Sequence, residues 1–247
     1  MRKGVYYISS IIALLLLSSC EIGFDFLNPA GPMKEVERPI IGRVSKIVIN
    51  HDVKVTVHVT EGRQYATVKA GENIISEVTT TMVDSTLTIR NESGKAWSTS
   101  FKNRKEVSLY LNNTVTAISY FGIQDVTVMD TIRANQFTYY CDESGGRVSI
   151  PLIANRCNIE QHSGVSDLII VGRCNDVDVY YKGTGWIYLQ DFKNSNMVVT
   201  NNGTGDILVN ASNNLTATIK SIGNIVYMGF PSITLVKDGK GNLRPAN

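Results

Sequence analysis

The sequence is short of the residue types on which most catalytic and metal sites depend. Its 247 residues include only 3 histidines and 4 cysteines, and 19% charged residues with a formal net charge of +2. This mild charge leaves no basic footprint for nucleic acid. The cysteine spacings match no zinc pattern, and no phosphate loop, nucleophile elbow or Ser-His-Asp order is present. We therefore predict no catalytic residue, no bound metal and no cofactor.

The N-terminal segment has the features of an export signal. A basic start at Arg2 and Lys3 is followed by the apolar run 11–17 and then by Leu-Ser-Ser-Cys, residues 17–20. This is a secretory signal peptide, and its apolar run is too short to span about 30 Å of hydrocarbon as a helix. The four residues ending at Cys20 resemble the lipobox of bacterial lipoproteins. We predict that residues 1–19 are removed and that Cys20 carries lipid; an ordinary signal peptide with a chance cysteine is the alternative.

Residues 20–40 are predicted to be a flexible tether between the lipid and a folded domain. They contain several prolines and glycines and have no sustained periodicity. Glu21 follows the cysteine, and nothing there resembles the aspartate of an inner-membrane retention signal. We expect a lipid-anchored envelope protein in the outer membrane, and the sequence leaves open whether it faces the periplasm or the cell surface.

A repeat of about 20 residues organises the segment 134–247. Glycines recur at Gly145, Gly164, Gly183, Gly203 and Gly223. Apolar residues alternate with polar ones on both sides of these glycines, as in the pairs Val177 and Val179, Met197 and Val199, Ala217 and Ile219, Leu168 and Ile170, Ile187 and Leu189, and Ile207 and Val209. Alternation of this kind indicates strands with one buried face, and we expect the glycines to supply turn geometries that strain other residues.

Units of two short strands cannot bury their apolar side alone, so successive units must stack around one core. The predicted fold is all-β, a right-handed parallel β-helix, since crossover connections are overwhelmingly right-handed. A propeller is the alternative, but its blade takes about 40 residues. Residues 41–133 alternate less regularly and are predicted to continue the same solenoid, joined to it through strands 118–120 and 126–128. Their polar segment 91–105 is predicted to be mobile.

Three cysteines besides Cys20 lie in the predicted domain, at Cys141, Cys157 and Cys174. Because the number is odd, at most one disulfide forms and at least one thiol stays free. Cys157 with Cys174 is the favoured pair, since the two would lie on neighbouring coils.

The end of the repeat resembles a known family. The run Gly223-Asn224-Ile225-Val226-Tyr227-Met228-Gly229-Phe230-Pro231 is similar to the ending of the head GIN domain family of autotransporter adhesins, with Ile222 in place of the first of two glycines. The lipobox, the early valine-rich strands and the Gly-x-Gly coils agree with it. The resemblance covers roughly residues 44–233 and implies a β-helical lipoprotein common in Bacteroidota. Its motifs are structural, so it implies no catalytic residue.

Candidate ligand-binding residues come from aromatic side chains that crowd the middle coils. Trp186 and Tyr188 alternate with the apolar Ile187 and Leu189, so we expect them to point outward, and Tyr181 is grouped with them. Exposed rings stack on sugars or contact proteins. The alternative is that the rings protect the strand surface or pack on a neighbouring subunit of an oligomer.

Other candidate sites have weaker patterns. His51 and His58 are seven residues apart on alternating strand residues, so they should face opposite sides and share no metal. Asp176 and Asp178 share one outward face, which is interpreted as a solvated surface. The triplets at Ser85 and Thr131 resemble the Asp-Ser/Thr-apolar acceptor of Bacteroidota O-glycosylation.

These patterns favour a non-enzymatic envelope lipoprotein whose β-helical surface binds a glycan or an envelope protein. One alternative is a carbohydrate-active enzyme with its site on the tyrosine-rich coils, which clustered acidic residues on one face would favour. A purely structural lipoprotein is the third hypothesis.

Overall fold

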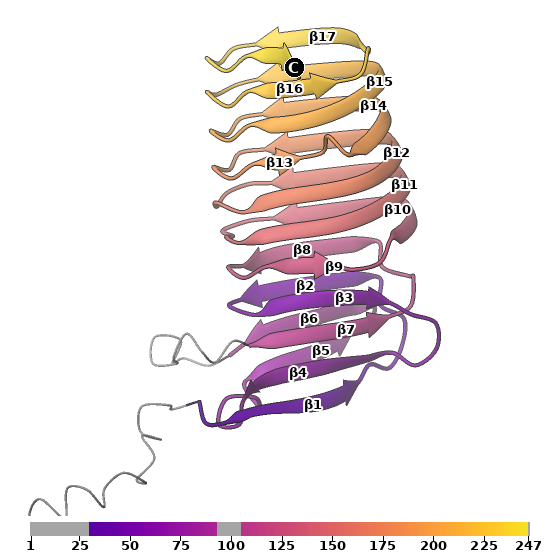
Figure 1. The fold of residues 1–247 in the computed structure, drawn as a ribbon, viewed down its shortest axis with the longest axis vertical. Helices are drawn as coiled ribbons and strands as arrows, with labels where there is room; N and C mark the ends of the chain where they lie inside the picture. The colour runs from indigo at the N-terminus through magenta and orange to yellow at the C-terminus, as the bar shows by residue number, and fades with distance from the viewer. Residues whose placement is uncertain (1–29, 93–104, 247) are drawn as a thin grey trace, which may run out of the picture.

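The protein is a stack of flattened β-coils (Figure 1). The computed structural model describes residues 30–92 and 105–246, and within them every regular element is a strand. The strands are β1 (Met33–Pro39), β2 (Lys46–His51), β3 (Lys54–Val59), β4 (Tyr65–Gly71), β5 (Val78–Val83), β6 (Thr86–Asn91), β7 (Glu106–Leu111), β8 (Ala117–Gly122), β9 (Val126–Val128), β10 (Ile132–Cys141), β11 (Arg147–Gln161), β12 (Asp167–Tyr181), β13 (Ile187–Tyr188), β14 (Phe192–Asn201), β15 (Ile207–Ile219), β16 (Ile225–Met228), β17 (Ser232–Lys237) and β18 (Leu243–Pro245). The described residues contain no helix that could cross a membrane.

Two parallel sheets face each other across one core, which confirms the predicted β-solenoid. β10, β11, β12, β14 and β15 pair in parallel, and each long strand bends so that its two halves belong to the two sheets. Val177 lies between Cys157 and Met197 in the ladder, so these coils are 20 residues long. All the apolar residues predicted to point inward are buried. Each large apolar side chain that is fully buried contributes about 1.5–3 kcal/mol.

Of the five glycines predicted to supply turn geometries, Gly164 has a positive φ of 96° and the other four do not. The Gly-x-Gly glycines have a different role. Neither Gly185 nor Gly205 has a positive φ, so neither is required for a left-handed turn. A Cβ on Gly205 would instead lie 1.6 Å from the carbonyl oxygen of Gly185, because the backbones of successive coils touch there. Gly223 in turn lies against the carbonyl oxygen of Gly205, so this coil is 18 residues long.

The N-terminal part continues the solenoid, but not in chain order. β8 and β9 join it to the regular coils as predicted, and β2 and β3 lie between the β8–β9 coil and the β6–β7 coil (Figure 1). At the outer end β4 pairs antiparallel with β1 and β7, and β5 pairs antiparallel with β6. β1 occupies Met33–Pro39, inside the segment predicted as a tether, so the ordered domain begins earlier than residue 41.

A column of polar side chains crosses the interior beside the glycine turns. The ladder aligns Tyr120, Cys141, Gln161, Tyr181 and Asn201, one from each coil, and all are buried. Each of these side chains bonds to the turn of its own coil or a neighbouring one; Asn201 Nδ2, for example, donates to the carbonyl oxygens of Gly205 (3.1 Å) and Asn224 (3.0 Å). Such bonds offset the cost of burying polar groups. The Oε1 atom of Gln161 is buried without a hydrogen-bond partner.

The predicted Cys157–Cys174 disulfide is not formed, and Cys141, Cys157 and Cys174 are free buried thiols. Cys157 and Cys174 do lie on neighbouring coils, but the ladder places Cys157 beside Val177 and Cys174 beside Ala154. The two cysteines are therefore three residues out of register. Burial raises the pKa of Cys174 to about 11, which keeps it protonated at neutral pH.

Candidate binding surface

The three predicted ligand-binding residues do not share one surface. Tyr181 is fully buried, and its hydroxyl donates to the carbonyl oxygen of Gly185 inside the coil. Grouping it with the outward rings is therefore wrong, because Tyr181 follows the inward phase of Val177 and Val179. Burial also raises the pKa of Tyr181, so it remains a neutral donor.

Trp186 and Tyr188 do point outward, as their phase predicts. Trp186 is 41% exposed and Tyr188 is half-buried. Their ring centroids are 5.8 Å apart and their planes differ by 23°, so the two rings form one apolar surface beside β13. The backbone nitrogen of Trp186 donates to Asp167 of the previous coil at 2.9 Å, which fixes where the indole leaves the sheet.

A second group of rings lies on the other sheet and runs across four coils. We call Phe121, Tyr140, His162 and Tyr180 the ring column. Consecutive centroids are 5.7, 5.2 and 5.3 Å apart, and all four side chains are half-buried. None of these four residues was among the ligand-binding residues predicted from the sequence.

The ladder explains why the ring column was hard to see in the sequence. Glu160, not an aromatic residue, lies between Tyr140 and Tyr180 in the strand register. His162 is two residues further on and reaches back between the two tyrosine rings, while its Nε2 lies 3.3 Å from Glu160. Hydrogen bonds from Asn158 and then from His162 lower the pKa of Glu160, so this position carries a negative charge.

The ring column borders a shallow depression of about 390 Å³. Its lining mixes apolar and polar groups that lie on β11, β12 and β14 or next to them: Asn158, Glu160, His162, Asp178, Val179, Tyr180, Val198 and Thr200. Val198 is 47% exposed, so the depression combines flat apolar surface with carboxylate, amide and hydroxyl groups. This composition resembles that of sites where a few polar groups orient a ligand on an apolar surface.

Near the N-terminal end, three more rings stack on the outer face. Tyr110 lies between His58 and Tyr65, with centroid distances of 4.7 and 4.5 Å and nearly parallel planes. The Arg63 guanidinium lies 5.0 Å from the Tyr65 ring centroid, in cation–π range. His58 therefore contributes to a ring stack, while His51 lies at the end of β2 with a φ of 63°.

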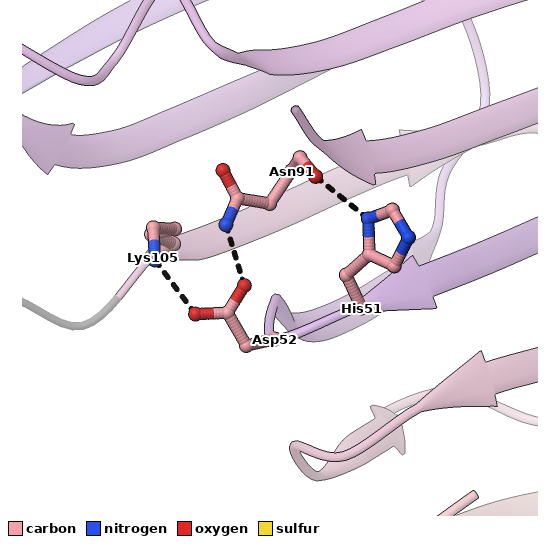
Figure 2. A network of polar contacts seen from close by, with 4 residues as sticks. All are labelled: His51, Asp52, Asn91 and Lys105. Carbon is pink, nitrogen blue, oxygen red and sulfur yellow. Dashed lines mark hydrogen bonds and ion pairs between the residues drawn. The ribbon is translucent and has the colours of Figure 1, made fainter. Parts of the chain in front are cut away.

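Asp52 links the residues that flank the segment 93–104 on both sides (Figure 2). The segment itself lies outside the described residues. The Lys105 side chain is 3% exposed, and its Nζ lies 2.6 Å from Asp52. Asn91 Nδ2 donates to the same carboxylate at 2.5 Å, and His51 Nδ1 lies 2.6 Å from the Asn91 carbonyl oxygen. Burial alone raises the pKa of Asp52, but the bonds from Lys105 and Asn91 outweigh it and lower the pKa. The two ends of the segment predicted to be mobile are thus firmly held.

The remaining predicted sites are distributed over the surface. Asp176 is half-buried and Asp178 exposed, which confirms their outward face. Ser85 lies in the turn between β5 and β6, bonded to the Ser45 hydroxyl at 2.7 Å, and Thr131 lies between β9 and β10. Within the described ranges no three His, Cys, Asp or Glu side chains are grouped to hold a metal. Cys20 lies outside the described residues.

The stacked coils and the C-terminal Gly-Asn-Ile motif agree with one family model, described as "Putative auto-transporter adhesin, head GIN domain", which matches residues 44–231. This chain belongs to the head GIN domain family. A "putative adhesin" from Bacteroides fragilis has the same fold, with a TM-score of 0.77 and 22% identity over 86% of this chain and 97% of that one. No curated protein matches the chain.

Two further solved structures share the head GIN fold. One is described as a "putative adhesin" from Parabacteroides merdae, with a TM-score of 0.60, 17% identity, and coverage of 88% of this chain and 97% of that one. Another is described as a "putative lipid binding protein" from Parabacteroides distasonis, with a TM-score of 0.64, 16% identity, and coverage of 87% and 97%. At these identities the likeness concerns the fold.

Proposed function

We propose that this head GIN protein is a non-enzymatic, lipid-anchored envelope module that binds glycan chains along its outer faces. The observation that carries the proposal is the ring column, in which four rings follow one another over four coils. Two of these rings, His162 and Tyr180, line a depression that also contains polar groups. The adhesin descriptions of the family and of its solved relatives agree with a binding role.

The spacing of the rings supports a glycan as the ligand. Successive rings are 5.2–5.7 Å apart along the stack, a repeat close to the length of one sugar unit. A glycan chain lying along the solenoid can therefore place one sugar against each ring. By analogy with pairs of aromatic side chains, each sugar–ring contact should contribute about 0.5–1.5 kcal/mol beyond area burial. Glu160, Thr200 and Asp178 supply acceptors and donors for sugar hydroxyls.

A glycan array with purified protein tests the proposal. Tyr140→Ala with Tyr180→Ala should weaken retention of the bound glycan about tenfold, because two stacking partners are lost. Trp186→Ala with Tyr188→Ala tests the second aromatic surface in the same way. The matched control is Thr216→Ala with Thr218→Ala, since both threonines are half-buried outward residues of β15 outside either ring group.

The melting temperatures of both ring variants should stay within a few degrees of the wild type, because these rings are partly exposed. Unchanged binding with collapsed stability would mean that the rings are structural and would contradict the proposal. Depolymerisation of a polysaccharide by the wild type would favour the alternative of a carbohydrate-active enzyme.

The anchor is tested separately. Radiolabelled palmitate should enter the wild-type protein in cells and should not enter Cys20→Ala, because the cysteine is the proposed lipid acceptor. Incorporation that survives the substitution would remove the membrane part of the proposal and leave the glycan part standing.

A further inference from the structure

A larger depression lies at the bend between the two sheets, and none of its lining residues belongs to the ring column or to the surface of Trp186 and Tyr188. It has a volume of about 540 Å³ and is built from the same three positions on three successive coils: Arg133, Ala134, Asn135, Ile153, Ala154, Asn155, Arg173, Cys174 and Asn175. Nothing in the proposed glycan contact with the ring column uses it.

The floor of the depression is small and apolar. Ala134, Ala154 and Cys174 follow one another in the strand register, and Ala154 and Cys174 are nearly buried. Because no long side chain projects from these positions, the space above them stays open. Ile153 is half-buried and adds an apolar surface on which the carbon face of a sugar can rest.

Two arginines stand on either side of Ile153. The ladder runs from Arg133 through Ile153 to Arg173, so the arginines are two coils, or about 10 Å, apart at the usual strand spacing. Both are exposed, and within residues 30–92 and 105–246 neither has a carboxylate in ion-pair range. Lys193 follows Arg173 in the same column. The nearby Asp176 accepts a bond from Asn196.

A ladder of asparagines forms the third wall. Asn155 Nδ2 donates to Asn135 Oδ1 at 2.7 Å, and Asn175 Nδ2 donates to Asn155 Oδ1 at 3.2 Å. Each amide nitrogen has two hydrogens, and the ladder uses one hydrogen of Asn155 and one of Asn175. The remaining N–H groups of this wall can donate to acceptors on a ligand, and the two arginines favour an anionic ligand.

We propose that this depression binds an acidic polysaccharide, with carboxylates of separate sugar units held by Arg133 and Arg173. A guanidinium fork matches a carboxylate with two parallel hydrogen bonds, which a lysine ammonium cannot reproduce. The asparagine N–H groups bond the carboxylate or ring oxygens between them, and the sugar between the two acidic groups rests on Ile153.

Titration calorimetry at physiological salt tests this, with hexagalacturonate as the acidic probe and its methyl ester as the neutral probe of equal length. The wild type should bind the acid and not the ester. Arg133→Gln with Arg173→Gln should weaken binding at least tenfold, and Arg133→Lys with Arg173→Lys should recover only part of it. The control Arg43→Gln with Lys220→Gln removes the same charge from two exposed residues elsewhere and should change binding less than twofold.

Three outcomes would overturn the site. The first is that the wild type does not bind hexagalacturonate, and the second is that it binds the methyl ester equally well. The third is that the Arg43 and Lys220 control weakens binding as much as the arginine variant does, because the effect would then come from overall charge. Tyr140→Ala with Tyr180→Ala separates the two proposals. If this ring variant no longer binds hexagalacturonate while the arginine variant still binds it, the acid binds on the ring column. In that case the proposed arginine site fails and the proposed function stands.

Discussion

The regular coils and the N-terminal strands bury similar apolar side chains, but different contacts hold them together. In the coils, each residue pairs with its equivalent about 20 positions away, and one polar column and one line of glycines repeat from coil to coil. In the N-terminal part, β2 pairs with β8 across 71 residues, and the antiparallel strands β1, β4 and β5 close the end of the core.

This difference shows how a solenoid can tolerate irregularity at one end. Each coil contacts only the coils next to it in the chain. The free energy of unfolding of the coil region is therefore close to a sum of the stabilities of single coils and of the interfaces between neighbouring coils. The N-terminal contacts close long loops and depend on a buried ion pair. Removing one of them is therefore expected to destabilise the whole N-terminal part. The opposite end is different again, because every residue of β17 is exposed and no strand covers it among the described residues.

Deleting part of the coil region should have the largest effect. Removal of residues 174–193 joins Arg173 to Asn194, which occupies the same register position as Cys174, so the stack closes with one coil fewer. Removal of 174–183 joins unlike positions and should abolish folding. Circular dichroism and urea unfolding check both, and a similar loss of folding in the two deletion variants would contradict independent coils.

Gly205→Ala should destabilise the coils by about 3–5 kcal/mol, near the top of the range for point mutations. The added Cβ meets the Gly185 carbonyl oxygen, which is backbone and cannot move aside without separating the coils. Gly145→Ala is the matched control, because its nearest neighbour would be 3.7 Å away and its φ is not positive. Chemical denaturation should find the control within about 1 kcal/mol of the wild type.

Asp52→Asn should destabilise the N-terminal part by about 3 kcal/mol, because the nearly buried Lys105 loses its counter-charge. The pKa of Asp52 is lowered in the folded state, so its contribution is complete above about pH 4 and is lost as the pH falls below that. Unfolding measured from pH 7 to pH 3 should show a shallower acid decline in the variant. An unchanged acid decline would mean that this pair does not govern acid stability.

Tyr181→Phe should cost about 1–2 kcal/mol, since it leaves the buried Gly185 carbonyl oxygen without its hydroxyl donor. Tyr188→Phe, on the half-buried outward surface, should stay within about 0.5 kcal/mol. Thermal unfolding of the two variants compares the interior column with the exposed rings directly. Equal effects would mean that the interior hydroxyl contributes no net stability.

Much of the coil architecture follows from the sequence, because a period of two and a repeat of about 20 are local patterns. The inward pairs such as Val177 and Val179, and the outward position of Trp186, were predicted from phase alone and are confirmed. Tyr181 was misplaced because it was grouped with other aromatics instead of being read by its phase.

The sequence by itself determined the strands of the regular coils, their buried faces, the stacking repeat and the family, since each depends on residues close together in the chain. Only the tertiary structure decided which distant residues became neighbours. Register brought Phe121, Tyr140, His162 and Tyr180 into one column, set Arg133 and Arg173 on either side of Ile153, and kept Cys157 and Cys174 apart. The reason is that lateral neighbours in a solenoid are set by coil length and bend geometry, and a difference of two or three residues changes every contact on the surface.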